Sequence, residues 1–231
     1  MPDVSIRAAD GGSFSAYLAT PSAGRGAGVL VVQEIFGVNK VMRDLADGFA
    51  RQGYVALCPD LFWRQEPGIQ ITDQTDAEWQ KAFSLYKGFN EAKGVEDLKS
   101  TLVQLRQLPA CAGKVGSVGY CLGGKLAYLM ATRTDADCSV GYYGVGIEGA
   151  LDEAKSIKKP LLLHIAEKDQ FCPPEAQAKI KDVLKGNAHV AMHSYAGMDH
   201  AFARAGGQHY DKAAADLANQ RTADFFKKNL R

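Results

Sequence analysis

A cysteine lies at the centre of a glycine-rich turn in this sequence. The segment Gly119–Gly124 reads Gly-Tyr-Cys-Leu-Gly-Gly, and it follows an apolar run and precedes a helical pattern. This is the G-x-S-x-G nucleophile elbow with a cysteine in the serine position, because the glycines keep side chains out of a crowded strand-to-helix turn. Backbone N–H groups at the start of the helix favour a negatively charged sulfur. Cys121 is therefore the predicted nucleophile, in preference to an incidental buried cysteine.

A nucleophile of this kind needs an acid and a histidine, which follow it in that order along the chain. Asp169 comes shortly after an apolar run that ends at Ala166, and His200 comes shortly after one that ends at Tyr195. Asp169 would hold one imidazole nitrogen of His200, while the other nitrogen exchanges a proton with Cys121. The order of the three residues thus predicts a Cys-His-Asp triad.

Other residues compete for two of these roles. Glu167 and Asp199 are alternative acids, although Asp199 adjoins His200 in sequence and would have difficulty in reaching its far nitrogen. Among the other histidines, His164 lies in the middle of a predicted strand, where it is expected to be a hydrogen-bonded core residue. The remaining three fit solvated positions better: His189, His193 and His209.

A carboxylate follows an earlier apolar run, in the segment Gln33–Gly37, Gln-Glu-Ile-Phe-Gly. Glu34 is either a surface residue or a neighbour of the nucleophile that hydrogen-bonds the neutral Cys121 thiol or helps to remove its proton. In the fold that uses the elbow, this loop supplies the second oxyanion-hole N–H. We therefore expect the backbone N–H groups of Ile35 and Leu122 to form the oxyanion hole.

These residues need a scaffold that brings strand ends together, and the sequence alternates short β-branched runs with amphipathic segments, as parallel sheets do. A hairpin over Val4–Leu18, turning at Gly11-Gly12, is expected at the sheet edge. An irregular stretch is expected over Asp60–Thr75. The pattern predicts an α/β-hydrolase fold with a mostly parallel sheet of seven or eight strands and helices on both faces. The predicted strands are Gly28–Glu34, Tyr54–Cys58, Lys114–Gly119, Ser139–Tyr143, Pro160–Ala166 and Val190–Tyr195, and the predicted helices are Val41–Arg51, Ala77–Phe89, Val95–Leu108, Gly124–Thr132, Pro174–Leu184 and Asp211–Asn229.

Composition limits the class of protein. A chain of 231 residues with 46% hydrophobic side chains can bury a sizeable core, and we expect one domain over residues 1–231. A net charge of +1 argues against a nucleic-acid partner.

The chain shows neither a signal peptide nor an apolar stretch long enough for a membrane span, which predicts a cytoplasmic protein without a membrane partner. Five scattered cysteines without a C-x-x-C pair predict free thiols, with no disulfide framework and no zinc site. We expect a monomer without a metal or other cofactor.

Five motifs together resemble the dienelactone hydrolase family. They are Gln33–Gly37, Cys58–Leu61 (Cys-Pro-Asp-Leu), Gly119–Gly124, Gly141–Gly144 (Gly-Tyr-Tyr-Gly) and His200–Arg204 (His-Ala-Phe-Ala-Arg), and the likeness spans nearly the whole chain. The resemblance implies a carboxymethylenebutenolidase-like activity and a triad that maps to Cys121, Asp169 and His200. It also implies that Glu34 holds the resting thiol until substrate displaces it.

The resemblance further implies a small substrate, an enol-lactone with a carboxylate that arginine binds. The expected reaction opens dienelactone to maleylacetate in the degradation of aromatic or chloroaromatic compounds. Arg204 matches one of the arginines, whereas the segment Glu78–Lys81 contains none, and Lys81 is the expected substitute. Phe36, Phe83 and Tyr86 are the expected aromatic part of the substrate pocket, although Phe83 and Tyr86 also fit core packing. Two alternatives remain: a hydrolase of another lactone, thioester or activated ester with the same triad, and a non-catalytic binding protein on the same scaffold.

Overall fold

The structure is a computed structural model that describes residues 3–230 of the chain. It divides the chain into two compact units, one that extends through Val115 and one that begins at Gly116. The boundary falls inside strand β5 (Cys111–Tyr120). The expectation of a single domain stays a prediction, and each unit is described below by itself.

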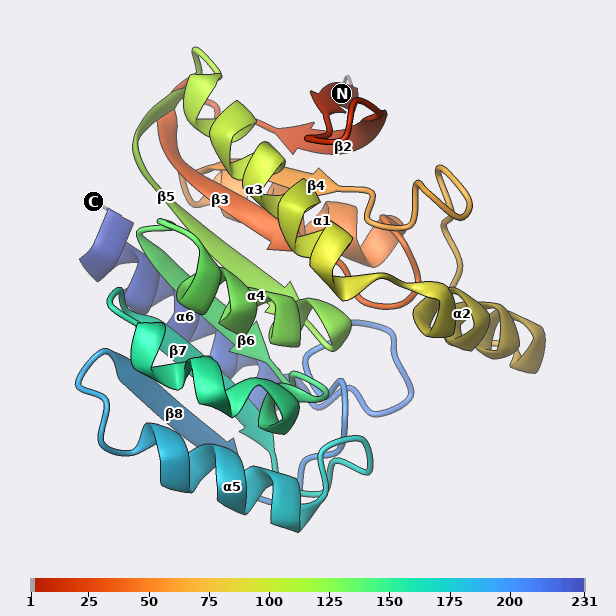
Figure 1. Cartoon of the computed structure of the whole chain (residues 1–231), viewed down its shortest axis with the longest axis vertical. Helices are drawn as coiled ribbons and strands as arrows, with labels where there is room; N and C mark the ends of the chain where they lie inside the picture. The colour runs from red at the N-terminus through yellow and green to blue at the C-terminus, as the bar shows by residue number, and fades with distance from the viewer. Residues whose placement is uncertain (1–2, 231) are drawn as a thin grey trace. The chain divides into compact units, whose positions relative to one another are not determined.

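The first unit contains a hairpin, two further strands and three helices. Strands β1 and β2 pair in antiparallel fashion, β2 pairs antiparallel with β4, and β3 pairs in parallel with β4. Helices α1 and α3 lie on opposite faces of these strands (Figure 1). The bounds are β1 Asp3–Arg7, β2 Ser13–Ala19, β3 Gly26–Val32, α1 Lys40–Arg51, β4 Val55–Pro59, α2 Asp76–Gly88 and α3 Glu91–Gln107.

Burial explains the composition of β3 and β4. Val29 to Val32 and Val55 to Leu57 are fully buried, because helices cover both faces of these strands and leave no side for polar residues. Polar caps explain where the helices begin. Asn39, Thr75 and Asn90 each accept a hydrogen bond from a backbone N–H in the first turn of α1, α2 and α3.

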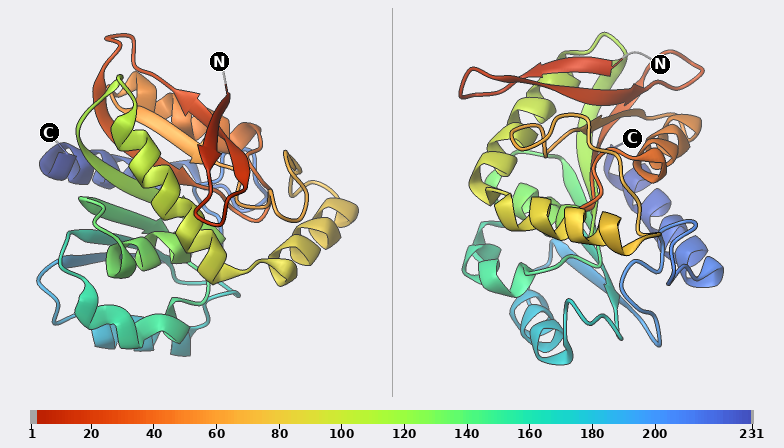
Figure 2. Two further views of the ribbon diagram at one scale, coloured as in Figure 1. Left: turned by 45° about the horizontal axis from the view of Figure 1, so that its top comes forward. Right: turned by 90° about the vertical axis from the view of Figure 1, so that its right-hand side faces the viewer.

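The second unit contains parallel strands that place the carboxyl ends of β5 to β8 along one edge. Strand β6 pairs in parallel with β5 and β7, and β7 pairs in parallel with β8. Helix α6 covers one face of these strands, and α4 and α5 lie on the other (Figure 2). The bounds are α4 Leu122–Arg133, β6 Cys138–Tyr142, the 3-10 segment η1 Ile147–Ser156, β7 Leu161–Ala166, α5 Pro174–Leu184, β8 Val190–Tyr195 and α6 Lys212–Leu230.

The predicted elements agree closely with this structure. Every predicted strand and helix is present, and β8 and α5 have the predicted bounds. The edge hairpin turns at Gly11, which has a φ of 94° that favours glycine. The segment η1 was not predicted, because its short, kinked course gives no sustained helical period. The prediction of an α/β fold with seven or eight mostly parallel strands is confirmed.

Candidate active site

Cys121 lies at the sharp turn between β5 and α4. Its backbone has φ 56° and ψ −114°, which an L-residue adopts only under strain. Backbone hydrogen bonds hold the turn in the second unit: the Cys121 N–H donates to the carbonyl of Tyr142, and the Cys121 carbonyl accepts from Gly124, Lys125 and Val145. The side chain is 7% exposed. The strained turn thus fixes a buried thiol at the first turn of a helix.

Two glycines of the elbow are required by close backbone contacts. A Cβ on Gly119 would lie 1.9 Å from the carbonyl oxygen of Gly123, and a Cβ on Gly124 would lie 2.4 Å from that of Tyr142. Neither contact can be relieved by a side-chain rotation, because both neighbours are backbone atoms. The glycines therefore permit the turn itself and the packing of α4 on β6.

Asp169 lies in the turn that follows β7, and its two carboxylate oxygens have separate partners. Oδ1 accepts the backbone N–H of Phe171 at 2.8 Å, and Oδ2 accepts Nδ1–H of His200 at 2.7 Å. The N–H of Lys168 donates to the carbonyl of Met198, which ties the loop of the acid to the loop of the histidine. The structure therefore brings the predicted acid and the predicted histidine into direct contact.

His200 is 4% exposed, and its surroundings favour the protonated imidazole. Burial lowers the pKa of His200, but the charge of Cys121, the hydrogen bond to Asp169 and the charge of Asp169 outweigh it and raise that pKa from 6.5 to about 10. Nε2 is buried and has no partner of ordinary hydrogen-bond geometry within the described residues. With Nδ1 bound to Asp169, Nε2 is the imidazole nitrogen that remains for proton exchange.

The competing residues lie elsewhere. Glu167 is exposed, and Oδ2 of Asp199 lies 3.7 Å from Nδ1 of His209, whereas Nδ1 of His200 is bonded to Asp169. His164 is fully enclosed, with Nδ1 bonded to the Tyr195 hydroxyl and Nε2 to the Thr222 hydroxyl. Burial lowers the pKa of His164 to about 3, and the nearby His193 and Arg221 add to this effect. The prediction that His164 is a hydrogen-bonded core residue is confirmed.

Two aromatic residues beside His200 had no assigned role from sequence. The ring centroids of Phe171 and Tyr143 lie 4.9 Å and 5.2 Å from that of the imidazole, both in edge-to-face geometry. Tyr143 has a φ of 37°, and Ala201 has a φ of 63°. The sequence signals were weak: Tyr143 is the last residue of a predicted strand and lies in the motif Gly141–Gly144, and Phe171 is two residues beyond Asp169.

Two further predicted site residues belong to the second unit. Leu122 is the first residue of α4, where the backbone N–H has no acceptor within the helix. Its N–H is thus suited to bind an oxyanion. Arg204 is 6% exposed, and its N–H donates to the carbonyl of Ala201 in the loop that follows His200.

The segment that holds Glu34 is enclosed within the first unit. Glu34, Ile35 and Phe36 are at most 5% exposed, so the alternative of a surface glutamate is wrong. The side chain of Gln33 holds this segment: its amide donates to the carbonyl of Glu34 and its carbonyl accepts the N–H of Leu61.

The other predicted substrate-binding residues lie on α2, also within the first unit. Lys81 forms an exposed ion pair with Glu66. Phe83 and Tyr86 are 45% and 39% exposed, so the alternative that they pack in the core is wrong. Trp79, on the same helix, lies against both Phe36 and Phe83, with centroid distances of 5.1 Å and 5.4 Å.

Within residues 3–230, no group of three or more potential ligand side chains could hold a metal ion. None of the helices in that range is long and apolar enough to cross a membrane.

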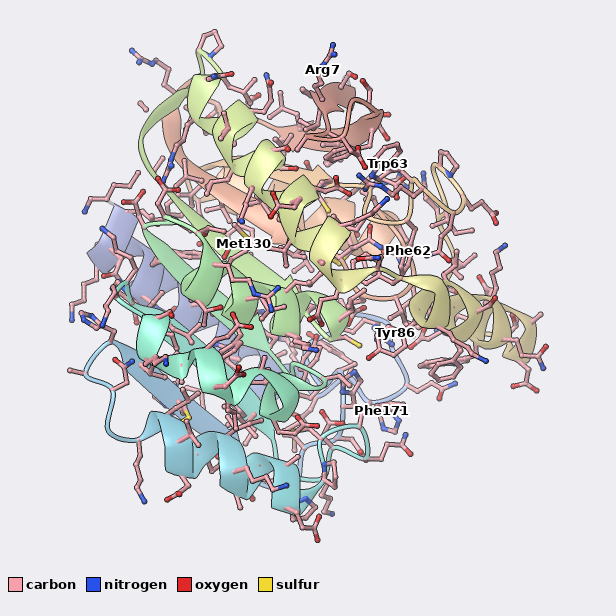
Figure 3. The ribbon with its side chains drawn as sticks, viewed as in Figure 1. Arg7, Phe62, Trp63, Tyr86, Met130 and Phe171 are labelled. Carbon is pink, nitrogen blue, oxygen red and sulfur yellow. The ribbon has the colours of Figure 1, made fainter. Side chains whose placement is uncertain are left out.

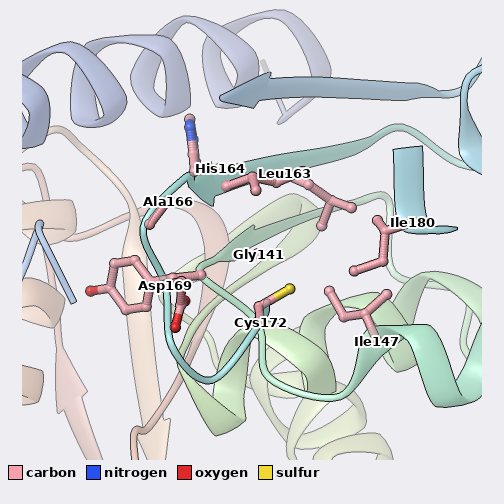
Figure 4. Close-up of a pocket in the computed structure, with 11 residues that line it drawn as sticks. Gly141, Ile147, Leu163, His164, Ala166, Asp169, Cys172 and Ile180 are labelled. Carbon is pink, nitrogen blue, oxygen red and sulfur yellow. The ribbon is translucent and has the colours of Figure 1, made fainter. Parts of the chain in front are cut away.

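A cavity of about 10 Å³ lies beside the turn that holds Asp169. It is lined by Asp169, Cys172 and apolar side chains such as Ile147 and Ile180 (Figure 4). It is close to the lower size limit for one water molecule and is too small for a substrate.

Comparison with known proteins identifies one family. The model of the dienelactone hydrolase family matches residues 14–230. A protein of Azospirillum brasilense named "Putative carboxymethylenebutenolidase" is 55% identical over the full length of both chains. The carboxymethylenebutenolidase of Pseudomonas sp. (strain P51) is 41% identical, over 97% of this chain and 94% of that protein.

A solved structure has the same fold. The "Putative Dienelactone Hydrolase" of Klebsiella pneumoniae subsp. pneumoniae MGH 78578 superposes with a TM-score of 0.86 at 26% identity, over 98% of both chains.

Proposed function

Since the chain belongs to the dienelactone hydrolase family and is a carboxylic ester hydrolase of the α/β-hydrolase fold, we propose that it opens a small enol-lactone with a Cys121-His200-Asp169 triad. The observation that carries this proposal is the hydrogen bond of 2.7 Å between His200 and Asp169. Cys121 lies close enough to the same imidazole to raise its pKa. A strained elbow, an oriented acid and a histidine in one unit are the parts that nucleophilic catalysis requires.

In the proposed reaction, Sγ of Cys121 attacks the carbonyl carbon of the lactone, and the N–H groups of Leu122 and Ile35 stabilise the oxyanion. The ring C–O bond then breaks. The thiol proton passes to His200 as Sγ attacks; the leaving oxygen departs as an enolate, which the His200 imidazolium protonates to the ketone, and the acyl group remains on sulfur as a thioester beside a neutral His200. His200 next removes a proton from water, which attacks the thioester and breaks the C–S bond. The products are the ring-opened carboxylate and the regenerated thiol.

The remaining roles come from the family resemblance. We propose that Glu34, which is almost fully buried, holds the resting thiol of Cys121 neutral, so that the charge of Cys121 acts on His200 only after substrate displaces Glu34. We propose that Arg204 binds the carboxylate of the substrate. The proposed aromatic neighbours of the substrate are Phe36, Phe83 and Tyr86. The proposed setting is the degradation of aromatic compounds in the cytoplasm by a monomer without a cofactor. The two relatives described above carry the name carboxymethylenebutenolidase.

One observation favours a second candidate substrate. Lys81, the expected substitute for an arginine, is paired with Glu66, which reduces its attraction for a carboxylate. The same triad would then act on a lactone, thioester or activated ester without a carboxylate. Rates with paired lactones that differ only in the carboxylate distinguish the two candidates. A preference of about tenfold or more for the carboxylated member, lost in Arg204→Met, supports the dienelactone substrate.

Substitution of the nucleophile tests the chemistry. Cys121→Ala should lower hydrolysis by several orders of magnitude, because removal of one member of a triad disables the whole unit. Stopped-flow assays with a lactone panel measure the loss, and circular dichroism checks the fold. Cys111→Ala, at a half-buried cysteine of the first unit, is the matched control and should keep its rate. Retention of full activity by Cys121→Ala would refute the mechanism.

A further inference from the structure

Phe171 contacts both the acid and the histidine of the proposed triad. It lies on the turn between β7 and α5 (Figure 3). Its backbone N–H donates to Oδ1 of Asp169 at 2.8 Å, while its ring lies 4.9 Å from the imidazole of His200 at an interplanar angle of 76°. One residue thus joins two groups that are otherwise linked by a single hydrogen bond.

The backbone contact determines how the carboxylate is used. The turn formed by this bond fixes the side-chain direction of the aspartate. Because Phe171 occupies Oδ1, the other oxygen of Asp169 faces Nδ1 of His200. The carboxylate of Asp169 is therefore held in one orientation, with Oδ2 toward His200.

A second ring meets the same imidazole from another loop. Tyr143, after β6, lies 5.2 Å from His200 at 64°, and it is 2% exposed. Its N–H donates to the carbonyl of His164, and its ring packs edge-on against the fully buried Phe202 at 5.6 Å. Tyr143 is thus a rigid support, whereas Phe171 is the half-buried ring, between the triad and water.

The rings of Phe171 and Tyr143 also lie beside an imidazole whose surroundings favour the protonated form. The side chains of His200 and Asp169 are 5% and 1% exposed, so water screens their interaction only weakly. Aromatic rings attract a nearby cation, and edge-to-face pairs are favourable beyond the area that they bury. Phe171 and Tyr143 can therefore hold the imidazolium ring in place and keep water away from its bond to Asp169.

We propose that Phe171 is a positioning residue, which together with Tyr143 clamps the imidazole of His200 and through its N–H orients Asp169. This inference rests on the proposed triad but adds a residue whose effect on the reaction is exerted through His200. The residues involved lie on three consecutive loops of one unit: Tyr143 after β6, Phe171 after β7 and His200 after β8. The ring of Phe171 is the part of the clamp that substitution can remove without altering the buried core.

The test compares Phe171→Ala and Phe171→Leu with Phe225→Ala. Phe225 is a half-buried phenylalanine of α6 in the same unit, so its truncation is a matched control. With p-nitrophenyl acetate as the probe, Phe171→Ala should lower kcat about tenfold, because a displaced imidazole transfers protons poorly. KM should change less than about twofold, since the ring acts through His200 and not on the substrate. Phe171→Leu should recover most of the rate, and Phe225→Ala should resemble the wild type.

A second readout needs no substrate. Titration of labelled histidine by NMR reports the pKa of His200 directly, in the presence of its two charged neighbours, Cys121 and Asp169. The clamp predicts that Phe171→Ala shifts the midpoint of His200, because a displaced imidazole changes its interactions with Cys121 and Asp169. It also predicts a weaker downfield resonance from the Nδ1–H proton. Phe225→Ala should change neither signal.

The outcomes separate the two proposals. Wild-type kcat with an unchanged His200 titration in Phe171→Ala overturns the clamp, and so does a change in KM alone, which would mark Phe171 as a substrate contact. If Phe171→Ala does not fold, Phe171→Tyr, which keeps a ring, and Phe171→Val, which lacks one, decide: equal kcat and equal His200 titration in these two variants overturn the clamp. If the wild type hydrolyses no ester or lactone while the His200 midpoint still moves in the variant, the clamp stands and the proposed function fails.

Discussion

His200 and His164 lie in the same unit, but their surroundings move the pKa in opposite directions. Burial and the nearby positive groups lower the pKa of His164 to about 3. At His200, burial also lowers the pKa, but Cys121 and Asp169 outweigh it. Two similarly buried imidazoles thus differ in charge near neutral pH, because only one of them has acidic neighbours.

A pH dependence of stability follows for His200. Its pKa is raised on folding, so the folded state binds the proton more tightly than the unfolded state. The stabilisation is complete below the unfolded value of 6.5 and is lost as pH rises to about 10. The Tm of the wild type should therefore fall across this window more steeply than that of His200→Gln, as differential scanning fluorimetry can measure. Parallel curves for the two proteins would contradict the raised pKa.

At the scale of single residues, the sequence predicted the contact between Asp169 and His200, because the fold orders nucleophile, acid and histidine along the chain. It did not predict the ion pair of Lys81 with Glu66 or the ring of Phe171 on His200. Such contacts depend on how loops lie in space, and no periodic pattern in the sequence records this.

Among the elements, the turn between β5 and α4 leaves no room for an added side chain at Gly119. Gly119→Ala places a methyl group 1.9 Å from the backbone oxygen of Gly123, so the turn must open or β5 must shift. Overpacking of this kind costs about 1–3 kcal/mol. Urea unfolding should show that loss, together with reduced hydrolysis, since the turn carries Cys121.

The matched control for the elbow is Gly149→Ala. Gly149 lies in η1 of the same unit, and a Cβ at this position meets nothing within 4 Å. This variant should unfold at nearly the urea concentration of the wild type. Equal stability of Gly119→Ala and Gly149→Ala would show that the turn relaxes more easily than its backbone contacts suggest.

The elements themselves were largely predictable, for a physical reason. Strands buried on both faces are short, continuous apolar runs, and such runs alternate with amphipathic helices in parallel sheets. β8 and α5 were predicted to the residue. The segment η1 was missed because its kink at Ala150 interrupts any helical period.

At the scale of the whole molecule, the prediction of one domain can be tested directly. The boundary between the two units falls between Val115 and Gly116, inside the continuous strand β5. A strand common to both units should transmit unfolding of either one, so calorimetry should show a single transition with equal calorimetric and van 't Hoff enthalpies. Two resolved transitions would contradict a single domain. The Cys121→Ala variant should give the same profile, because the loss of one sulfur does not alter the topology.

The strained turn at Cys121 has a consequence for protein engineering. Its φ of 56° and ψ of −114° would be adopted with less strain by glycine, which lacks a Cβ. A selection for thermal stability alone would therefore favour replacing this residue, whereas a selection for turnover would retain it. Libraries screened by heat challenge before activity would accumulate inactive clones at this position. Position 121 should accordingly be held constant when thermostable variants of this hydrolase are sought.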